Sequence, residues 1–189
     1  MNEDIKSLFD FTVEIEKMKS IERRTKIINI DRRENDAEHS FSIATMAIAF
    51  HNLAPSADLG KTVQMLLVHD LVEIYAGDTF AYDIKGNETK AARERAAADK
   101  LYSMLPGDRG EYMRSLWEEF DQCESVEAKF ANAMDRLQPV INNIKNNGGT
   151  WLEFNVSKAQ LEKRLAPVRE FNIEIYNYLM EEASKYLKK

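Results

Sequence analysis

Apolar residues recur at three- and four-residue intervals along nearly the whole chain, the spacing that lines one face of an α-helix. A clear case lies near the C-terminus, where Leu161, Leu165 and Val168 follow one another at this spacing. The same pattern predicts seven helices, over residues 7–18, 36–48, 59–76, 88–105, 112–120, 125–141 and 157–179.

Helix-capping and helix-breaking residues fall between these segments. Ser7, Asp36 and Ser125 are placed to cap helices, and residues 157–160, Ser-Lys-Ala-Gln, match a capping box. Pro167 is expected to bend the last helix, because a proline has no N–H to bond the preceding turn.

One stretch lacks the helical pattern. Residues 20–35 are strongly charged, and we expect them to be irregular. The β-branched residues Ile27, Ile28 and Ile30 within it are too few to build a sheet. The expected fold class is therefore all-α, a helical bundle of about seven helices that forms a single domain over residues 1–189.

Composition narrows the class of protein without changing this fold. Hydrophobic residues make up 44% and charged residues 31%, a balance that is ordinary for a globular domain. The formal net charge is −6, and no basic stripe is visible in the sequence. We therefore expect no nucleic-acid polymer as a partner.

The cysteine count and the N-terminal sequence bear on location. Cys123 is the only cysteine, so the sequence predicts no internal disulfide and suits a reducing compartment. The N-terminal residues lack the pattern of a signal peptide. No apolar run approaches the roughly 20 residues that span a bilayer. These features predict a cytoplasmic protein that has no membrane partner.

The third predicted helix carries polar groups that a buried helix would not normally choose. His69 and Asp70 are adjacent, and Glu73 follows one turn later, so all three project from one side. Asp78 comes directly after Gly77, where the helix is expected to end. Burial would cost roughly 1–3 kcal/mol for each unpaired polar group, and a divalent cation would remove much of that cost. The alternative is a polar helix face that meets water.

Further features suggest which residues could complete a metal site. A second histidine, His39, stands within Ala-Glu-His-Ser at a predicted helix start, and Asp135 lies within Ala-Met-Asp-Arg-Leu-Gln-Pro. Together with His69-Asp70 these features resemble the HD-domain metal-dependent phosphohydrolases, in which a His, a His-Asp pair and a distant Asp bind one divalent metal. The resemblance covers about residues 23–139. It implies an HD-domain bundle with His39, His69, Asp70 and Asp135 as metal ligands.

Two longer patterns refine this resemblance. Residues 32–40 read Arg-x-Glu-Asn-x-x-Glu-His-Ser, and residues 69–78 read His-Asp-Leu-x-Glu-x-x-x-Gly-Asp. Both are similar to the branch of the superfamily that contains the bacterial and eukaryotic 5'-deoxynucleotidases. That branch implies a homodimer that acts on nucleoside monophosphates.

The implied ligand set also bears on the metal and its chemistry. Two imidazoles and two carboxylates suit Mn, Co, Fe, Ni or Zn better than Mg or Ca, which prefer oxygen ligands. Four protein ligands leave two positions of a six-coordinate cation for a water and a phosphate oxygen. Glu73 is placed to orient that water or take its proton. Asp78 could act as a second base or protonate the leaving alkoxide.

Arginines gather ahead of His39. They could be solvated loop charges, but a phosphate ester needs a cation on its remaining oxygens. Arg23 is the first candidate for this contact and Arg32 is the second. By the resemblance, Arg24 stands where the nucleotidases carry a tryptophan that helps exclude the ribose 2'-hydroxyl, so this position departs from the family pattern.

The leading hypothesis is an enzyme, a metal-dependent phosphomonoesterase that hydrolyses ribo- or deoxyribonucleoside 5'-monophosphates to nucleoside and phosphate. One alternative keeps the site and changes the substrate to a cyclic nucleotide, a pyrophosphorylated nucleotide or a non-nucleotide phosphate. The other is a non-catalytic binding module that holds the metal for structure.

Overall fold

A computed structural model of the chain describes residues 2–188. The α-helices in these residues are α1 (Glu3–Ile15), α2 (Asp36–Phe50), α3 (Leu59–Val68), α4 (Glu73–Ala76), α5 (Ile84–Tyr102), α6 (Arg109–Gln122), α7 (Val126–Lys145), α8 (Gly149–Glu153), α9 (Lys158–Arg164), α10 (Ala166–Phe171) and α11 (Ile173–Ala183). Two 3-10 helices, η1 (Glu16–Ser20) and η2 (His51–Leu53), and two strands, β1 (Glu22–Lys26) and β2 (Arg33–Asn35), are also present. The all-α class is confirmed, although the helices are more numerous than the seven that the sequence predicts.

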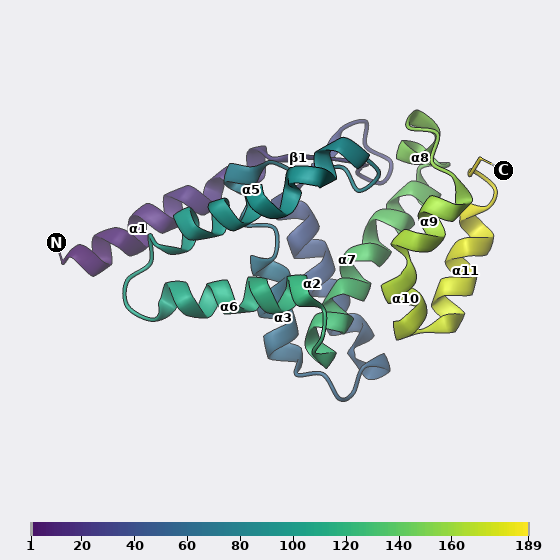
Figure 1. The fold of residues 1–189 in the computed structure, drawn as a ribbon. Coiled ribbons are helices and arrows are strands. Elements are labelled where there is room, and N and C mark those ends of the chain that lie inside the picture. The colour runs from purple at the N-terminus through teal and green to yellow at the C-terminus, as the bar shows by residue number, and fades with distance from the viewer. Residues whose placement is uncertain (1, 189) are drawn as a thin grey trace.

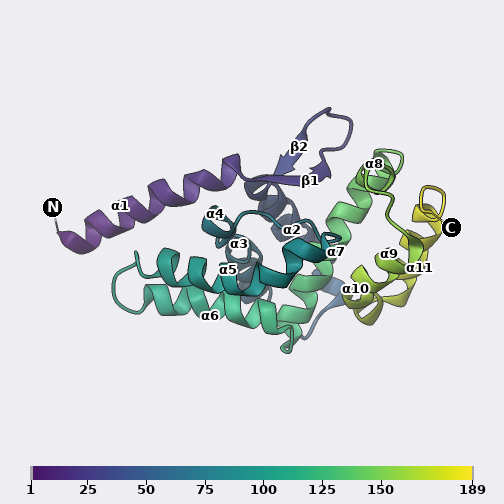
Figure 2. The same cartoon turned by 45° about the horizontal axis from the view of Figure 1, so that its top comes forward.

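Helix α7 lies at the centre of the molecule (Figure 1). It packs against α2, α3 and α6 on one side and against α10 and α11 on the other. Its side chains Phe130, Met134 and Leu137 are at most 2% exposed and belong to the hydrophobic core. Helices α5 and α6 lie side by side, and α1 extends away from the rest of the protein (Figure 2).

Side-chain caps fix where several helices begin. Ser125 caps α7, and Ser157 with Gln160 forms the predicted capping box at α9. The predictions that Ser7 and Asp36 cap helices are wrong. Asn2 caps α1, in which Ser7 is an internal residue, and Asn35 caps α2 and forms a capping box with Glu38. Asp36 is instead the first helical residue and is completely buried.

The predicted helix over 59–76 is divided in two. Helix α3 ends at Val68, and α4 begins at Glu73. The turn between them contains His69 and Asp70, so these side chains do not follow a continuous helical face. Gly77 ends α4 with a φ of 74°, a left-handed value that glycine adopts without strain.

The stretch expected to be irregular is a β-hairpin. Strands β1 and β2 pair antiparallel, with Glu22 opposite Asn35 and Lys26 opposite Arg33. The sequence did not reveal these strands because their buried positions are polar: Arg23 and Thr25 in β1 and Glu34 in β2. The hairpin therefore buries polar side chains against the rest of the protein, where a strand would usually bury apolar ones.

The predicted C-terminal helix is divided into α9, α10 and α11. Pro167 lies in the first turn of α10, where a proline is tolerated because its missing N–H would have no helical partner. Asn172 then adopts an extended conformation and caps α11. Among residues 2–188, no helix is both long enough and apolar enough to cross a membrane.

Candidate metal centre

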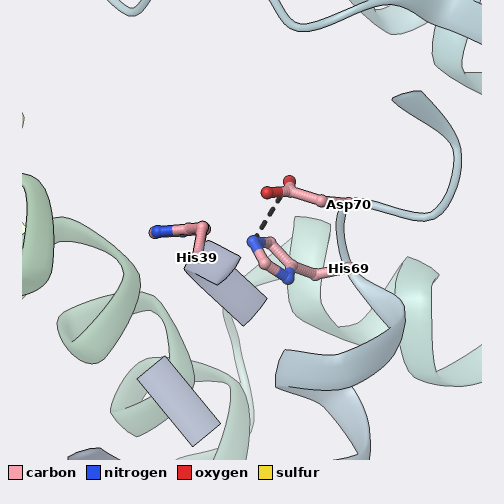
Figure 3. Close-up of side chains that lie close together, drawn as sticks. All are labelled: His39, His69 and Asp70. Atoms are coloured by element: carbon pink, nitrogen blue, oxygen red, sulfur yellow. Dashed lines mark ion pairs between the residues drawn. The ribbon is translucent and has the colours of Figure 1, made fainter. Parts of the chain in front are cut away.

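The structure brings together the four residues that the sequence suggested as metal ligands. His39 lies in the first turn of α2, His69 and Asp70 lie in the turn after α3, and Asp135 lies near the middle of α7. Because α2, α3 and α7 pack against one another, these side chains meet although they are far apart in the sequence. Figure 3 shows His39, His69 and Asp70 at this meeting point.

The distances among the four side chains are short. The Nε2 atom of His39 lies 3.0 Å from Oδ1 of Asp135. The Nε2 atom of His69 lies 3.1 Å from Oδ1 of Asp70 and 3.9 Å from the same Asp135 oxygen. All four residues are buried, and ligand atoms of His39, His69 and Asp70 lie within 4.8 Å of one another. This is a compact group of nitrogen and oxygen donors.

The other nitrogen of each imidazole has a fixed acceptor. The Nδ1–H of His39 donates to Oε1 of Gln138 at 3.1 Å, and the Nδ1–H of His69 donates to the carbonyl oxygen of Leu66 at 2.9 Å. Gln138 is itself held, because its amide donates to Glu34 at 2.6 Å. With its proton on Nδ1, the neutral form of each imidazole presents an Nε2 lone pair, as metal-binding histidines do.

The Nε2 atoms face carboxylate oxygens, an arrangement that is stabilised by positive charge at or between these groups. Burial acts to lower the pKa of His69, but Asp70 outweighs it and raises this pKa, so in the absence of a cation a proton on His69 supplies part of that charge. The buried Nε2 of His69 has no hydrogen-bond partner within residues 2–188. Burial, aided by Arg23, lowers the pKa of His39 to about 4, so this imidazole is neutral at pH 7 and supplies no proton to Asp135. A divalent cation fits this donor set.

Glu73 and Asp78 lie beside the cluster. Glu73 is 4% exposed, and its Oε2 has no hydrogen-bond partner in the described part of the chain. Burial, together with Asp70 and Asp36, raises the pKa of Glu73 well above its usual range. Burial also raises the pKa of Asp78. Carboxyl groups with raised pKa next to a candidate cation site are suited to proton transfer.

Arg23 reaches the cluster from β1. Its Nη1 lies 2.7 Å from Asp70 and 3.2 Å from Asp36, and its Nε lies 3.8 Å from Glu34. Burial acts to lower the pKa of Arg23, but Asp70 and the other carboxylates outweigh it and hold this pKa well above its usual value. Asp36, Asp70 and Glu73 also form a close group of ligand atoms. Arg23 already supplies positive charge to two of these three.

Arg32 lies apart from the cluster. Its guanidinium donates to both oxygens of Glu38, at 2.5 and 2.8 Å, and its side chain is 52% exposed. It does not line the cavity beside the cluster, as far as residues 2–188 define that cavity. The geometry therefore gives Arg32 no support as the second phosphate contact.

Two buried residues have roles at the cluster that the sequence patterns do not predict. The sequence indicates Asp36 only as a helix cap, and it gives no role to Gln138. Asp36 precedes His39 by three residues, and Gln138 follows Asp135 by three, so one helical turn links each to a candidate ligand. That spacing is the signal that could have found both.

A cavity of about 270 Å³ opens beside the cluster. Its lining is mostly charged and comes from β1, the segment around α4, and helices α5, α6, α7 and α9. Arg136 and Arg164, which no sequence pattern singled out, form part of its wall. Burial and the neighbouring Arg136 lower the pKa of Arg164 to about 10. The cavity suits a small, charged molecule.

This helical fold and its buried His-Asp cluster define the class of protein. Residues 15–174 match the family described as the HD domain, and the chain belongs to this family. Membership implies a divalent metal, and the group of His39, His69 and Asp70 could hold one.

Individual relatives are consistent with this family. A human protein named 5'-deoxynucleotidase HDDC2 is 29% identical over 137 residues, which are 72% of this chain and 66% of that protein. A Photorhabdus temperata protein named 5'-deoxynucleotidase yfbR is 28% identical over 166 residues, 82% and 83% of the two chains. The crystal structure of a predicted metal-dependent phosphohydrolase from Magnetospirillum magnetotacticum MS-1 has a TM-score of 0.92 and 40% identity, covering 98% of this chain and 96% of that one. The chain thus spans just under two thirds of the human relative.

Proposed function

We propose that the protein is a metal-dependent phosphomonoesterase in which His39, His69, Asp70 and Asp135 hold one divalent transition metal. The observation that carries this proposal is the pair of imidazoles whose Nε2 atoms both face buried carboxylates. The mixed donor set favours Mn, Co, Fe, Ni or Zn over Mg or Ca. We assign the whole of residues 1–189 to a single HD domain.

The surrounding side chains supply the rest of the proposed chemistry. When bound, the cation would act as a Lewis acid, which would withdraw charge from phosphorus and lower the pKa of water. Arg23 lines the cavity and is proposed to bind a non-bridging phosphate oxygen. Glu73 is proposed to take the proton of the attacking water, and Asp78 to protonate the leaving 5'-oxygen.

The reaction balances as a hydrolysis. The water oxygen forms a bond to phosphorus while the bond between phosphorus and the nucleoside oxygen breaks. One water proton passes to Glu73, and the leaving alkoxide takes a proton from Asp78. The products are a nucleoside and inorganic phosphate.

The proposed substrates are ribo- and deoxyribonucleoside 5'-monophosphates. The support comes from the two relatives named 5'-deoxynucleotidases and from a cavity whose charged lining suits a small phosphorylated molecule. The homodimer that the family resemblance suggests stays a prediction, to be checked by sedimentation of the purified protein.

Phosphate release tests this function. The purified chain is incubated with a panel of ribo- and deoxyribonucleoside 5'-monophosphates in the presence of Mn²⁺, Co²⁺, Ni²⁺, Zn²⁺ or Mg²⁺. We expect release from at least one 5'-monophosphate, faster than from nucleoside 3'-monophosphates or from p-nitrophenyl phosphate. Metal-loaded protein that shows no preference for 5'-monophosphates would contradict the proposal.

A further inference from the structure

A second, smaller cavity adjoins the one beside the metal cluster. It has a volume of about 70 Å³ and shares part of its wall with the larger cavity. The shared residues are Arg23, Asp78, Thr79, Ala81, Arg136 and Arg164. Because the two cavities have six residues in common, a molecule bound at the cluster could extend from one into the other.

The lining of the small cavity is cationic. It includes four arginines, which are Arg23, Arg24, Arg136 and Arg164, against a single carboxylate, Asp78. The lining of the larger cavity, by contrast, has more carboxylates than cations. The lining of the small cavity therefore has an excess of positive charge, and three of its four arginines also line the larger cavity.

Two of these arginines share one carboxylate. Arg136 pairs with Oδ2 of Asp135, and Nη2 of Arg164 lies 4.0 Å from the same oxygen. Arg136 also donates to Asn132 at 3.3 Å. Since Asp135 is also a candidate metal ligand, its charge cannot fully balance both guanidiniums. The side chains of Arg136 and Arg164 are 22% and 30% exposed, so both retain donors that can reach a bound molecule.

The remaining walls of the small cavity restrict what can enter. Trp151 and Val140 are nearly fully buried and provide apolar surface, while Thr25 contributes a hydroxyl. At about 70 Å³, the space is far below the roughly 300–1,000 Å³ of pockets that hold whole small molecules. It is suited to one tetrahedral anion, which several guanidiniums can bind through charge-assisted hydrogen bonds.

We propose that this small cavity is an anion subsite, in which Arg136 and Arg164 bind a second phosphate of the substrate. The scissile phosphate lies at the metal cluster, and the second phosphate belongs to the same nucleotide. The preferred substrate is thus a doubly phosphorylated nucleotide. This inference rests on the proposed function for its reaction, but the subsite itself can be tested without catalysis.

The kinetic test compares substrates that differ only in the second phosphate. Metal-loaded enzyme is assayed with a deoxynucleoside 5'-monophosphate, its 3',5'-bisphosphate and its 5'-diphosphate. We expect kcat/KM for phosphate release to be higher for one of the doubly phosphorylated substrates. In the 3',5'-bisphosphate the bond from phosphorus to the 5'-oxygen breaks, whereas in the 5'-diphosphate the anhydride bond to the terminal phosphorus breaks and the 5'-monophosphate leaves. Arg164→Gln should reduce that preference by about tenfold to a hundredfold, mainly through KM, as the loss of a charged hydrogen bond predicts.

Lys163→Gln is the matched control. It removes the same charge from the neighbouring position of α9, and Lys163 lines neither cavity among the described residues. It should leave the substrate preference unchanged. A wild-type enzyme with no preference for a second phosphate would overturn the proposal, and so would an Arg164→Gln variant that keeps the full preference.

A binding experiment separates this proposal from the proposed function. Calorimetric titration of metal-loaded protein with inorganic phosphate should give two sites per chain, one of which is lost in Arg164→Gln and kept in Lys163→Gln. A single site in the wild-type protein would refute the subsite even if nucleotides are hydrolysed. Two sites in a protein that hydrolyses no nucleotide would support the subsite and refute the proposed function.

Discussion

The orientation of His39 depends on a neutral side chain. Gln138 accepts the Nδ1–H of His39, and its own amide is held by Glu34, so one chain of hydrogen bonds fixes the ring. Partners of this kind orient metal-binding histidines and keep the correct tautomer. The strength of metal binding should therefore depend on a residue that does not touch the metal.

Replacing Gln138 with leucine should weaken metal binding by about 10–100-fold, the usual effect of removing such a partner. The measurement is a titration of metal-free protein with Mn²⁺ or Zn²⁺. Gln64→Leu is the control, because Gln64 is an exposed residue of α3 whose amide donates to the carbonyl of Gly60 and accepts from the hydroxyl of Tyr112. If the Gln138 variant binds the metal as tightly as the wild-type protein does, then His39 is not a ligand or does not need this hydrogen-bond partner.

Glu73 should separate catalysis from metal binding. Glu73→Gln keeps the size of the side chain and removes the carboxylate that is proposed to take a proton. We expect the metal to be retained and phosphate release to fall by about 10²–10⁴-fold, the typical contribution of a general base. Metal content from elemental analysis and the rate are measured on the same preparation. If Glu73→Ala leaves both unchanged, the proposed role is wrong.

At the residue scale, the sequence predicted site residues where they lie within one helical turn or in one dipeptide. His69, Asp70 and Glu73 stood out because polar groups interrupt an apolar run. Arg164 did not, because its neighbours in the sequence give no sign that α9 returns to the cluster. Only the packing of helices distant in the sequence brings its guanidinium near Asp135.

At the scale of elements, the start of α2 positions much of the cluster. The capping box of Asn35 and Glu38 fixes the first turn, from which Asp36 and His39 both face inward. Asn35→Ala should lower the free energy of unfolding by about 1 kcal/mol, with a range of 0.5–2. Urea denaturation measures this change. Asn35→Asp, which preserves a capping oxygen, should stay close to wild type, and an equal loss in both variants would contradict the capping role.

Two elements escaped prediction, for opposite reasons. The hairpin β1–β2 buries polar residues, so its strands lack the alternation of apolar and polar positions that marks a strand. The turn at 69–72 continues the apolar pattern through Leu71 and Val72, so the helix seemed unbroken. Arg23 and Glu34 of the hairpin contact residues of the cluster or their partners, whereas Leu71 and Val72 in the turn belong to the hydrophobic core.

At the scale of the whole molecule, removal of the metal should reduce stability. A ligand that binds only the folded state, at 100 to 1,000 times its Kd, contributes roughly 3–4 kcal/mol. For a chain of this size that corresponds to about 5–15 °C in Tm. Chelation with EDTA, followed by thermal unfolding, measures the change.

Asp70→Ala provides the control for chelation. This variant should lack the metal, so EDTA should leave its Tm unchanged, and elemental analysis confirms the metal content. If EDTA removes the metal from the wild-type protein but leaves its Tm unchanged, the metal is not held between helices as proposed.

The pairing of His39 with Asp135 joins positions 96 residues apart, about half of the chain. An ion bound there would act as a removable cross-link, closing a loop that contains α3 to α6. Because the cation would bind only the folded arrangement, its binding free energy opposes any opening that separates these positions. Hydrogen exchange should therefore accelerate throughout these enclosed helices when the ion is withdrawn, while α11, which lies beyond the loop, should respond less.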